Sequence, residues 1–245
     1  MISRMLRERQ LTFHIAETTL KMGEIVTNMG SCFATGPKVT LLNLSPSAIT
    51  DQEITDKAKA EFARAATPAE RLRFGCIATG IAHLKSFSRY IRQHPNLTLA
   101  QLHELVTKLA VSFTDDDLDQ LIPLYVTNGR INTQKLLSDV KIPLAEHRQK
   151  LLRDVFEKIA GEKGATEVDV AKFVRNFSFK QDRDYVSGKK SDSQIREEFK
   201  KKFNLAEHED GKVTLDDFID YYGSISYGCH SDAYFDLFLR QAWNY

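Results

Sequence analysis

One short pattern occurs four times along the 245-residue chain: an aliphatic residue, then a polar residue able to start a helix, and a large apolar residue five positions after the first. The first and last residues of the four copies are Leu97 and Leu102, Ile131 and Leu136, Val168 and Phe173, and Val213 and Phe218. The copies begin 34, 37 and 45 residues apart, a spacing typical of helix–loop–helix repeats. The polar residue caps the outgoing helix and the apolar residue enters the core. The sequence therefore predicts an all-α fold of four helix–loop–helix units.

The four units are expected to pair, because one helix–loop–helix unit cannot bury its own apolar face. Pro143 marks the boundary between the two pairs, since proline discourages a continuous helix. We therefore expect lobe 1 over residues 67–142 and lobe 2 over residues 143–245. Short β-bridges should join the paired loops, between Leu97 and Ile131 and between Val168 and Val213.

The first 66 residues differ from the rest, because they carry no clean hydrophobic period and contain clustered turn signals. A helix is predicted to begin near Thr50 or Asp51, and Thr67, Pro68 and Glu70 predict a second, sharply capped start. We interpret residues 1–66 as an N-terminal extension that docks on another molecule. The alternative is that the extension packs against its own globular part.

Composition excludes several classes of protein. The net charge of +1 offers no excess of positive charge for nucleic acid, and no stretch approaches the roughly 18 apolar residues of a membrane span. The three cysteines have no CxxC spacing, so we expect reduced thiols in the cytosol instead of a disulfide framework. No HExxH, GxGxxG, GxxxxGK or GxSxG motif occurs, so no enzymatic activity is expected.

Three segments resemble the calcyphosine and calcyphosine-like EF-hand family. They are Leu72 to Ile81, with Cys76, Ile77 and Gly80 between them, Phe203 to Tyr222, and Ser224 to Trp243. The resemblance covers about residues 68–245 and leaves residues 1–66 outside. It implies a cytoplasmic, all-helical protein with four EF-hands, no catalytic activity, and calcium binding that must be checked loop by loop.

The first three loops lack the ligands that the EF-hand pattern requires. Calcium takes six to eight oxygen ligands, with acidic side chains early in the loop and a bidentate carboxylate at its end. The position of that last carboxylate holds Gln101 in the first loop, Lys135 in the second and Lys172 in the third. An ammonium group has no acceptor and repels the ion. These three degenerate loops are therefore not expected to bind calcium.

The fourth loop keeps part of the ligand set. Compared with the family pattern, Asn204 and His208 replace aspartates, Asp210 is retained, and Asp217 replaces the terminal glutamate. With Thr214 these residues form the candidate metal site. Aspartate is one methylene too short for ready bidentate ligation, and a histidine nitrogen suits transition metals better than a hard cation. We favour a metal-free turn kept for packing, with no cofactor; the alternative is calcium at low occupancy in this loop alone.

Two surface features have alternative interpretations. Lys189-Lys190 and Lys200 to Lys202 are interpreted as solvated helix surface, with contact to an acidic polymer such as tubulin as the alternative. The apolar C-terminal run is expected to fill the groove of lobe 2, with a partner protein as the alternative. Its residues are Tyr234, Phe235, Leu237, Phe238, Leu239 and Trp243.

Packing residues retained without most calcium ligands indicate a structural adaptor, not a switch. Calcyphosine-like proteins are associated with ciliated cells, so the resemblance implies a cytoskeletal protein of the ciliary or flagellar axoneme, bound to doublet microtubules. Its expected partners are tubulin or other axonemal proteins, and not nucleic acid or membrane. The alternative function is a calcium sensor or buffer that uses only the fourth loop.

Overall fold

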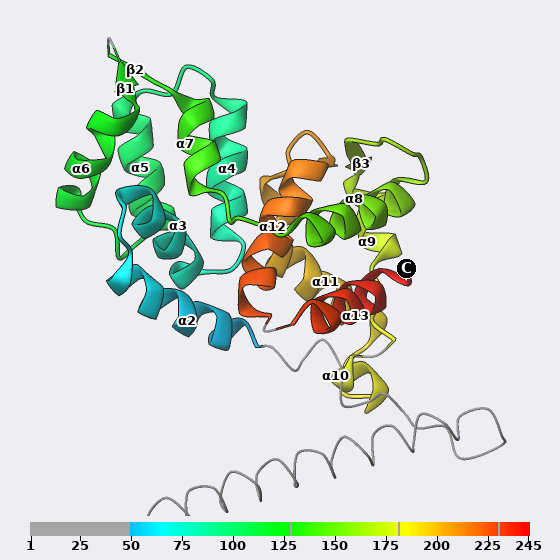
Figure 1. Cartoon of the computed structure of the whole chain (residues 1–245). Coiled ribbons are helices and arrows are strands. Elements are labelled where there is room, and N and C mark those ends of the chain that lie inside the picture. The colour runs from blue at the N-terminus through cyan, green and yellow to red at the C-terminus, as the bar shows by residue number, and fades with distance from the viewer. Residues whose placement is uncertain (1–49, 128, 181, 230) are drawn as a thin grey trace, which may run out of the picture. The chain divides into compact units, whose positions relative to one another are not determined.

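The computed structural model describes residues 50–127, 129–180, 182–229 and 231–245 (Figure 1). This part is mostly helical with two small two-stranded sheets, which confirms the predicted all-α, EF-hand-like fold. Predictions about residues 1–49 lie outside the described residues. None of the described helices is long and apolar enough to cross a membrane.

The helices follow the predicted helix–loop–helix order. An N-terminal helix, α2 (Asp51–Arg64), precedes lobe 1. Lobe 1 contains α3 (Pro68–Thr79), α4 (His83–Gln93), α5 (Leu99–Leu109), α6 (Asp115–Tyr125) and α7 (Thr133–Val140). Lobe 2 contains α8 (Glu146–Ala160), α9 (Val170–Asn176), α10 (Arg183–Val186), α11 (Asp192–Phe203), α12 (Leu215–Gly228) and α13 (Asp232–Trp243). Pro143 lies in the non-helical link between α7 and α8.

Capping residues explain where most of these helices begin. Thr67 accepts a hydrogen bond from the Glu70 N–H while the Glu70 carboxylate accepts from the Thr67 N–H, as predicted. The same reciprocal arrangement starts α2, α5, α6, α11 and α12. Each cap satisfies backbone donors that the first helical turn leaves free. Local sequence therefore sets the start of most elements.

The two small sheets agree with the expected bridges in lobe 2 but not in lobe 1. In lobe 2, β3 (Glu167–Asp169) pairs antiparallel with β4 (Lys212–Thr214), and Val168 lies opposite Val213 as predicted. The predicted partnership of Leu97 with Ile131 is wrong. Ile131 in β2 (Arg130–Ile131) pairs with Val126 in β1 (Val126–Thr127). The shortened second loop folds back on itself through Gly129, whose φ of 73° suits a tight turn.

Helix α2 is part of the folded unit. It begins at Asp51 as predicted, and Ile54 and Ala58 on its inner face are buried. The helix packs on α3 of lobe 1 and also contacts α12 of lobe 2. The Lys57 ammonium donates a hydrogen bond to the Tyr227 carbonyl at 2.8 Å. Residues 51–64 of the expected extension therefore bridge both lobes.

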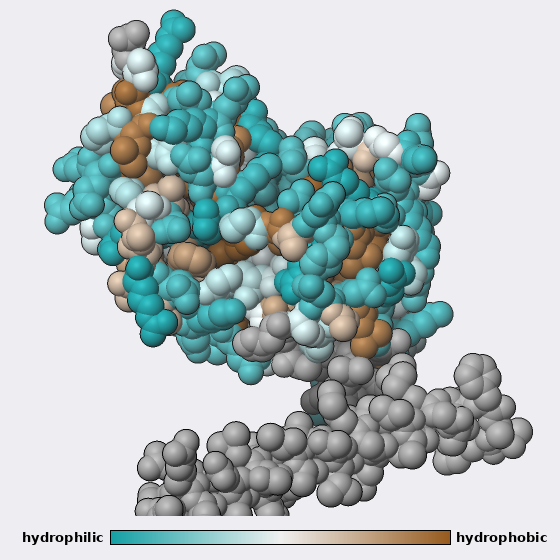
Figure 2. Space-filling view, in the orientation of Figure 1, coloured by the Kyte–Doolittle hydropathy of each residue, from teal (hydrophilic) through white to brown (hydrophobic). Residues whose placement is uncertain are grey.

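The apolar C-terminal run packs into lobe 2, as predicted in preference to contact with a partner protein. Phe235, Leu239 and Trp243 on α13 are buried. The Trp243 indole N–H donates to the Tyr222 hydroxyl at 2.8 Å. Phe238 instead lines a pocket of about 550 Å³ between α2, α11, α12 and α13. Figure 2 shows that the visible face is largely hydrophilic, with small apolar patches between helices.

The aromatic cluster around Phe218 should hold lobe 2 together. Phe218 is fully buried, and its ring lies 4.6 Å from Tyr222 and 5.7 Å from Trp243 between centroids. We expect Phe218→Ala to lower the free energy of unfolding by about 3–5 kcal/mol, because it removes apolar contacts and leaves a cavity. Denaturant unfolding measures this loss.

The matched control for Phe218→Ala is Val111→Ala, since Val111 is 70% exposed. This control should change the free energy of unfolding by about 0.5 kcal/mol or less. Equal effects of the two substitutions would contradict the assignment of Phe218 to the core.

Candidate functional site

The five candidate ligand residues lie around the fourth loop, between α11 and α12. Asn204 ends α11 in the left-handed conformation, with φ of 56°. His208 and Asp210 follow a short 3₁₀ turn, Leu205–Glu207. Thr214 caps α12, and Asp217 completes the capping box within the first turn of that helix. Thr214 therefore serves the helix start, and the other four residues face a neighbour that sequence reasoning did not identify.

That neighbour is the polar face of α4 in lobe 1. Lys85, Arg89 and Arg92 lie at spacings of four and three residues, so they share one side of the helix. The apolar residues Leu84, Phe87 and Ile91 lie on a different side and are buried. Because α4 contacts α12, its basic side faces the fourth EF-hand unit.

Arg89 binds the carboxylates of Asp210 and Asp217. Its Nη1 donates to Asp217 Oδ2 at 2.5 Å, and its Nη2 lies 2.8 Å from both carboxylate oxygens of Asp210. The Arg89 side chain is 5% exposed and that of Asp217 is fully buried. A buried charge needs a partner of opposite sign, because removing it from water is strongly unfavourable. The guanidinium therefore neutralises the carboxylates that an ion would otherwise bind.

Lys85 binds backbone carbonyls at the N-terminal end of the same loop. Its ammonium donates to the Phe203 carbonyl at 2.8 Å and to the Asn204 carbonyl at 3.3 Å. It also lies 3.2 Å from His208 Nε2. His208 Nδ1 lies 2.6 Å from the Lys212 carbonyl, which can only accept. Nδ1 therefore carries the proton of the neutral imidazole, and Nε2 accepts from Lys85.

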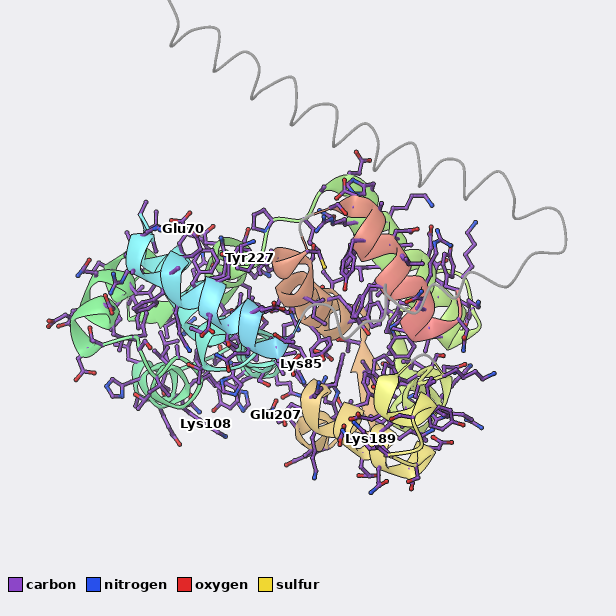
Figure 3. The ribbon with its side chains drawn as sticks, turned by 90° about the horizontal axis from the view of Figure 1, so that it is seen from below. Glu70, Lys85, Lys108, Lys189, Glu207 and Tyr227 are labelled. Atoms are coloured by element: carbon purple, nitrogen blue, oxygen red, sulfur yellow. The ribbon has the colours of Figure 1, made fainter. Side chains whose placement is uncertain are left out.

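Further polar contacts extend the junction. Arg92 donates to Asp217 Oδ1 at 3.0 Å and to Asp220 Oδ2 at 2.8 Å. The Asn204 side-chain amide donates to the Ser86 hydroxyl at 3.2 Å. Figure 3 shows Lys85 of lobe 1 beside Glu207 of lobe 2, whose charged atoms are 4.0 Å apart. We name the set of Lys85, Arg89 and Arg92 with their lobe 2 partners the interlobe clamp.

Burial and charge shift the pKa values in this clamp. Burial lowers the pKa of Lys85 to about 8, even though Glu207 and Asp217 favour its charged form. Burial and then the charge of Lys85 lower the pKa of His208. Burial alone would raise the pKa of Asp217, but hydrogen bonds from Thr214 and the charges of Arg89 and Arg92 keep it below its usual value. The clamp therefore favours the charged form of Asp217, whereas burial raises the pKa of Asp220.

With α4 in place, the fourth loop does not fit a calcium ion. Asp210 and Asp217 supply the expected carboxylates, but both bind the Arg89 guanidinium. The Lys85 ammonium takes the backbone oxygens at the end of α11. Within the described ranges, no group of three or more His, Cys, Asp or Glu side chains is placed to hold a metal ion. The arrangement binds the two lobes to each other.

The second and third loops contain a related arrangement built from local residues. Lys135 replaces the last carboxylate of the second loop, and its ammonium donates to the Leu124 carbonyl near the end of α6 at 3.1 Å. Lys172 replaces it in the third loop and donates to the Ala160 carbonyl at the end of α8. A cation is favourable at the carboxyl end of a helix. In the fourth loop the equivalent ammonium comes from lobe 1.

The clamp residues of α4 were missed because their partners are distant in sequence. Arg89 and Asp217 are separated by 128 positions. The available signal was the basic stripe of Lys85, Arg89 and Arg92 beside an apolar stripe on one helix. Such a stripe is also typical of a solvated helix face, so it identifies a polar interface only when a buried acidic partner is known.

The other predicted basic patches are largely neutralised. Lys200 pairs with Glu197, Lys202 with Asp51, and Lys190 with Asp184 and Glu198. Phe199 and Phe203 of the same helix are buried, as the solvated-surface interpretation expected. These contacts favour that interpretation over a dedicated surface for an acidic polymer.

Comparison with known proteins gives a distant relative. No protein-family model matches the chain. The chain is similar to a protein named crustacean calcium-binding protein 23, from Faxonius limosus, with 24% identity over 201 residues. The similarity covers 79% of this chain and 99% of the Faxonius protein. Together with the helix–loop–helix units and the β3–β4 pairing, it supports an EF-hand-like protein without identifying the calcyphosine family in particular.

The lowered pKa of His208 predicts an acid-sensitive clamp. Below pH 6.5 the unfolded chain binds a proton at this residue while the folded protein resists it, so the free energy of unfolding falls as the pH is lowered. An imidazolium would also face the Lys85 ammonium and lie near Arg89, with Asp217 as the partial counter-charge. Denaturant unfolding between pH 7 and 5 measures the loss.

The substitution His208→Gln should reduce this acid sensitivity, because glutamine does not titrate. The matched control is His103→Gln, since His103 is half-exposed and lies outside the clamp. If His208→Gln and the wild-type chain lose stability equally between pH 7 and 5, His208 is not the acid-sensitive group.

Proposed function

We propose that this chain is a non-enzymatic structural adaptor of EF-hand type in which calcium binding is largely lost. The observation that carries the proposal is the Arg89 guanidinium bound to Asp210 and Asp217 in the fourth loop. An EF-hand sensor responds when ion binding changes the packing of its helices. Here side-chain cations contact the backbone carbonyls of the second, third and fourth loops. The clamp favours one fixed arrangement of the lobes, which suits an adaptor.

For the cellular setting we propose the ciliary or flagellar axoneme, on doublet microtubules, within the cytoplasmic cytoskeleton. This proposal rests on the resemblance of the segments Leu72–Ile81 and Phe203–Trp243 to calcyphosine-like proteins. The proposed partners are tubulin or other axonemal proteins. Since Lys190, Lys200 and Lys202 already pair within the chain, a shaped protein surface is a better basis for that contact than a free basic patch.

A second candidate function is a calcium sensor or buffer that uses the fourth loop alone. Two observations favour it: the relative from Faxonius limosus is named a calcium-binding protein, and Asp210 is half-exposed. For this chain to bind calcium in that loop, the ion would have to compete with Arg89 for the same oxygens. The competition makes tight binding by the wild-type chain unfavourable.

Isothermal titration of the full-length chain with calcium separates the two functions. We expect no binding at micromolar calcium, the range of EF-hand sensors, because the Asp210 and Asp217 carboxylates are already paired. Asp210→Ala is the matched variant, since it removes the more exposed carboxylate. Tight binding by the wild-type chain that is lost in Asp210→Ala would replace the adaptor with the sensor.

Fractionation of cilia tests the proposed setting. A tagged full-length chain should remain with the axoneme after detergent extraction, and a chain lacking residues 1–49 should be released if that segment anchors it. The deletion stops before Thr50 because Ile54 and Ala58 of α2 belong to the core. Circular dichroism controls for folding of the shortened chain.

Each arm of the fractionation can contradict a separate part of the proposal. A full-length chain found only in the detergent-soluble fraction would rule out the axonemal setting. Retention of the shortened chain on the axoneme would show that residues 1–49 are not its anchor.

A further inference from the structure

Three of the four loops receive a positively charged side chain from the protein itself. Lys135 and Lys172 do so within their own loops, each at the position of the missing carboxylate. The fourth loop retains an acidic residue there, Asp217, and its own Lys212 pairs with Glu167 and Asp169 of β3. Its cations come from α4, as the Lys85 ammonium and the Arg89 guanidinium. The second and third loops thus receive their positive charge from a residue of the same loop, and the fourth loop receives it from lobe 1.

We infer that Lys85 and Arg89 are the resident cations of the fourth loop, and that a divalent cation and the α4 helix exclude each other there. The inference rests on the proposed function, because an adaptor of fixed shape requires the loop to stay closed on α4. The inference names the ligand class of the fourth loop, a hard divalent cation. It also names how binding is regulated: α4 of lobe 1 displaces the cation. The loss of calcium affinity would then have two causes. Asn204 and His208 replace aspartate ligands, and Arg89 occupies the carboxylates that remain.

The four carboxylate oxygens of Asp210 and Asp217, the ligand carboxylates of the candidate site, are all occupied by guanidinium groups. Arg89 contacts both oxygens of Asp210 and one oxygen of Asp217. The second oxygen of Asp217 accepts from Arg92. A divalent ion at these atoms would lie close to the buried Arg89 guanidinium and the partly buried Arg92 guanidinium, and like charges repel strongly where water is excluded. The ion can therefore bind Asp210 and the Oδ2 atom of Asp217 only after the Arg89 guanidinium withdraws.

Withdrawal of Arg89 would affect the whole interface between the lobes. Arg89 belongs to a helix whose Leu84, Phe87 and Ile91 are buried, so it cannot leave by local fraying. Arg92 shares its helix and binds Asp220, and Ser86 binds Asn204. Occupancy of the loop by a divalent cation and contact between α4 and α12 are thus coupled, and each should weaken the other.

The test compares calcium binding by full-length variants that lack the resident cations. Arg89→Met, and the double variant Lys85→Met with Arg89→Met, keep apolar bulk but remove positive charge. We expect them to bind calcium with a Kd of about 10⁻⁴–10⁻³ M, the range of weak EF-hand sites, and about tenfold or more tighter than the wild-type chain. Isothermal titration and calcium-dependent thermal unfolding measure the gain.

Two controls show whether the gain belongs to the fourth loop. Adding Asp210→Asn to the double variant should abolish it, because the site then loses a carboxylate. Arg73→Met is the matched arginine control, since Arg73 donates to the Val140 and Asp139 carbonyls within lobe 1. This control should leave calcium binding as in the wild-type chain.

Failure to fold also gives a decisive result. If the variants unfold without calcium, recovery of folded protein on adding calcium supports the inference, and no recovery overturns it. Folded variants without a calcium response also overturn it. A gain that survives Asp210→Asn, or that equals the gain in Arg73→Met, overturns it too.

The wild-type arm separates this inference from the proposed function. Tight calcium binding by the wild-type chain contradicts both the adaptor and the exclusion by Arg89. Absence of binding in the wild type and in both variants leaves the adaptor standing and removes only the exclusion.

Discussion

The buried contact between Arg89 and Asp217 determines how the two lobes lie. Both side chains are almost entirely removed from water, so each depends on the other for charge compensation. Asp217 also completes the capping box that starts α12, through the Thr214 N–H. One carboxylate therefore links the start of a lobe 2 helix to a cation on a lobe 1 helix. A change at this contact would alter secondary structure and lobe arrangement together.

This contact joins the two lobes at the fourth EF-hand-like loop. The loop keeps the features that an EF-hand needs for folding, including the β-bridge of Val168 with Val213 and the buried Phe218. Its ligand oxygens are satisfied by ammonium and guanidinium groups. A guanidinium is planar and directional, so it orients the bonded carboxylates more strictly than a mobile ion would. The expected outcome is an arrangement of lobes that does not depend on cellular calcium.

Helix α2 contacts both lobes, and helix α13 packs within lobe 2. Helix α2 packs on α3 and reaches lobe 2 through Lys57 and Tyr227. Helix α13 places Trp243 among the aromatic rings of lobe 2, where an EF-hand sensor would expose apolar surface to a target. Both observations agree with the adaptor proposal, because α13 already covers the apolar surface that a sensor would expose to its target.

Short-range patterns in the amino-acid sequence were enough to predict the local elements. Capping pairs such as Thr67 with Glu70 predicted helix starts, and the fourfold apolar pattern predicted the helix–loop–helix units, because both depend on residues within a few positions of each other. The replacement of loop carboxylates by Lys135 and Lys172 was visible for the same reason. The pairing of Ile131 with Val126, and the contacts of Lys85 and Arg89 with the fourth loop, became known only from the three-dimensional fold. Those contacts depend on how a truncated loop turns and on which helix face meets a loop more than a hundred residues away, and no local pattern encodes that meeting.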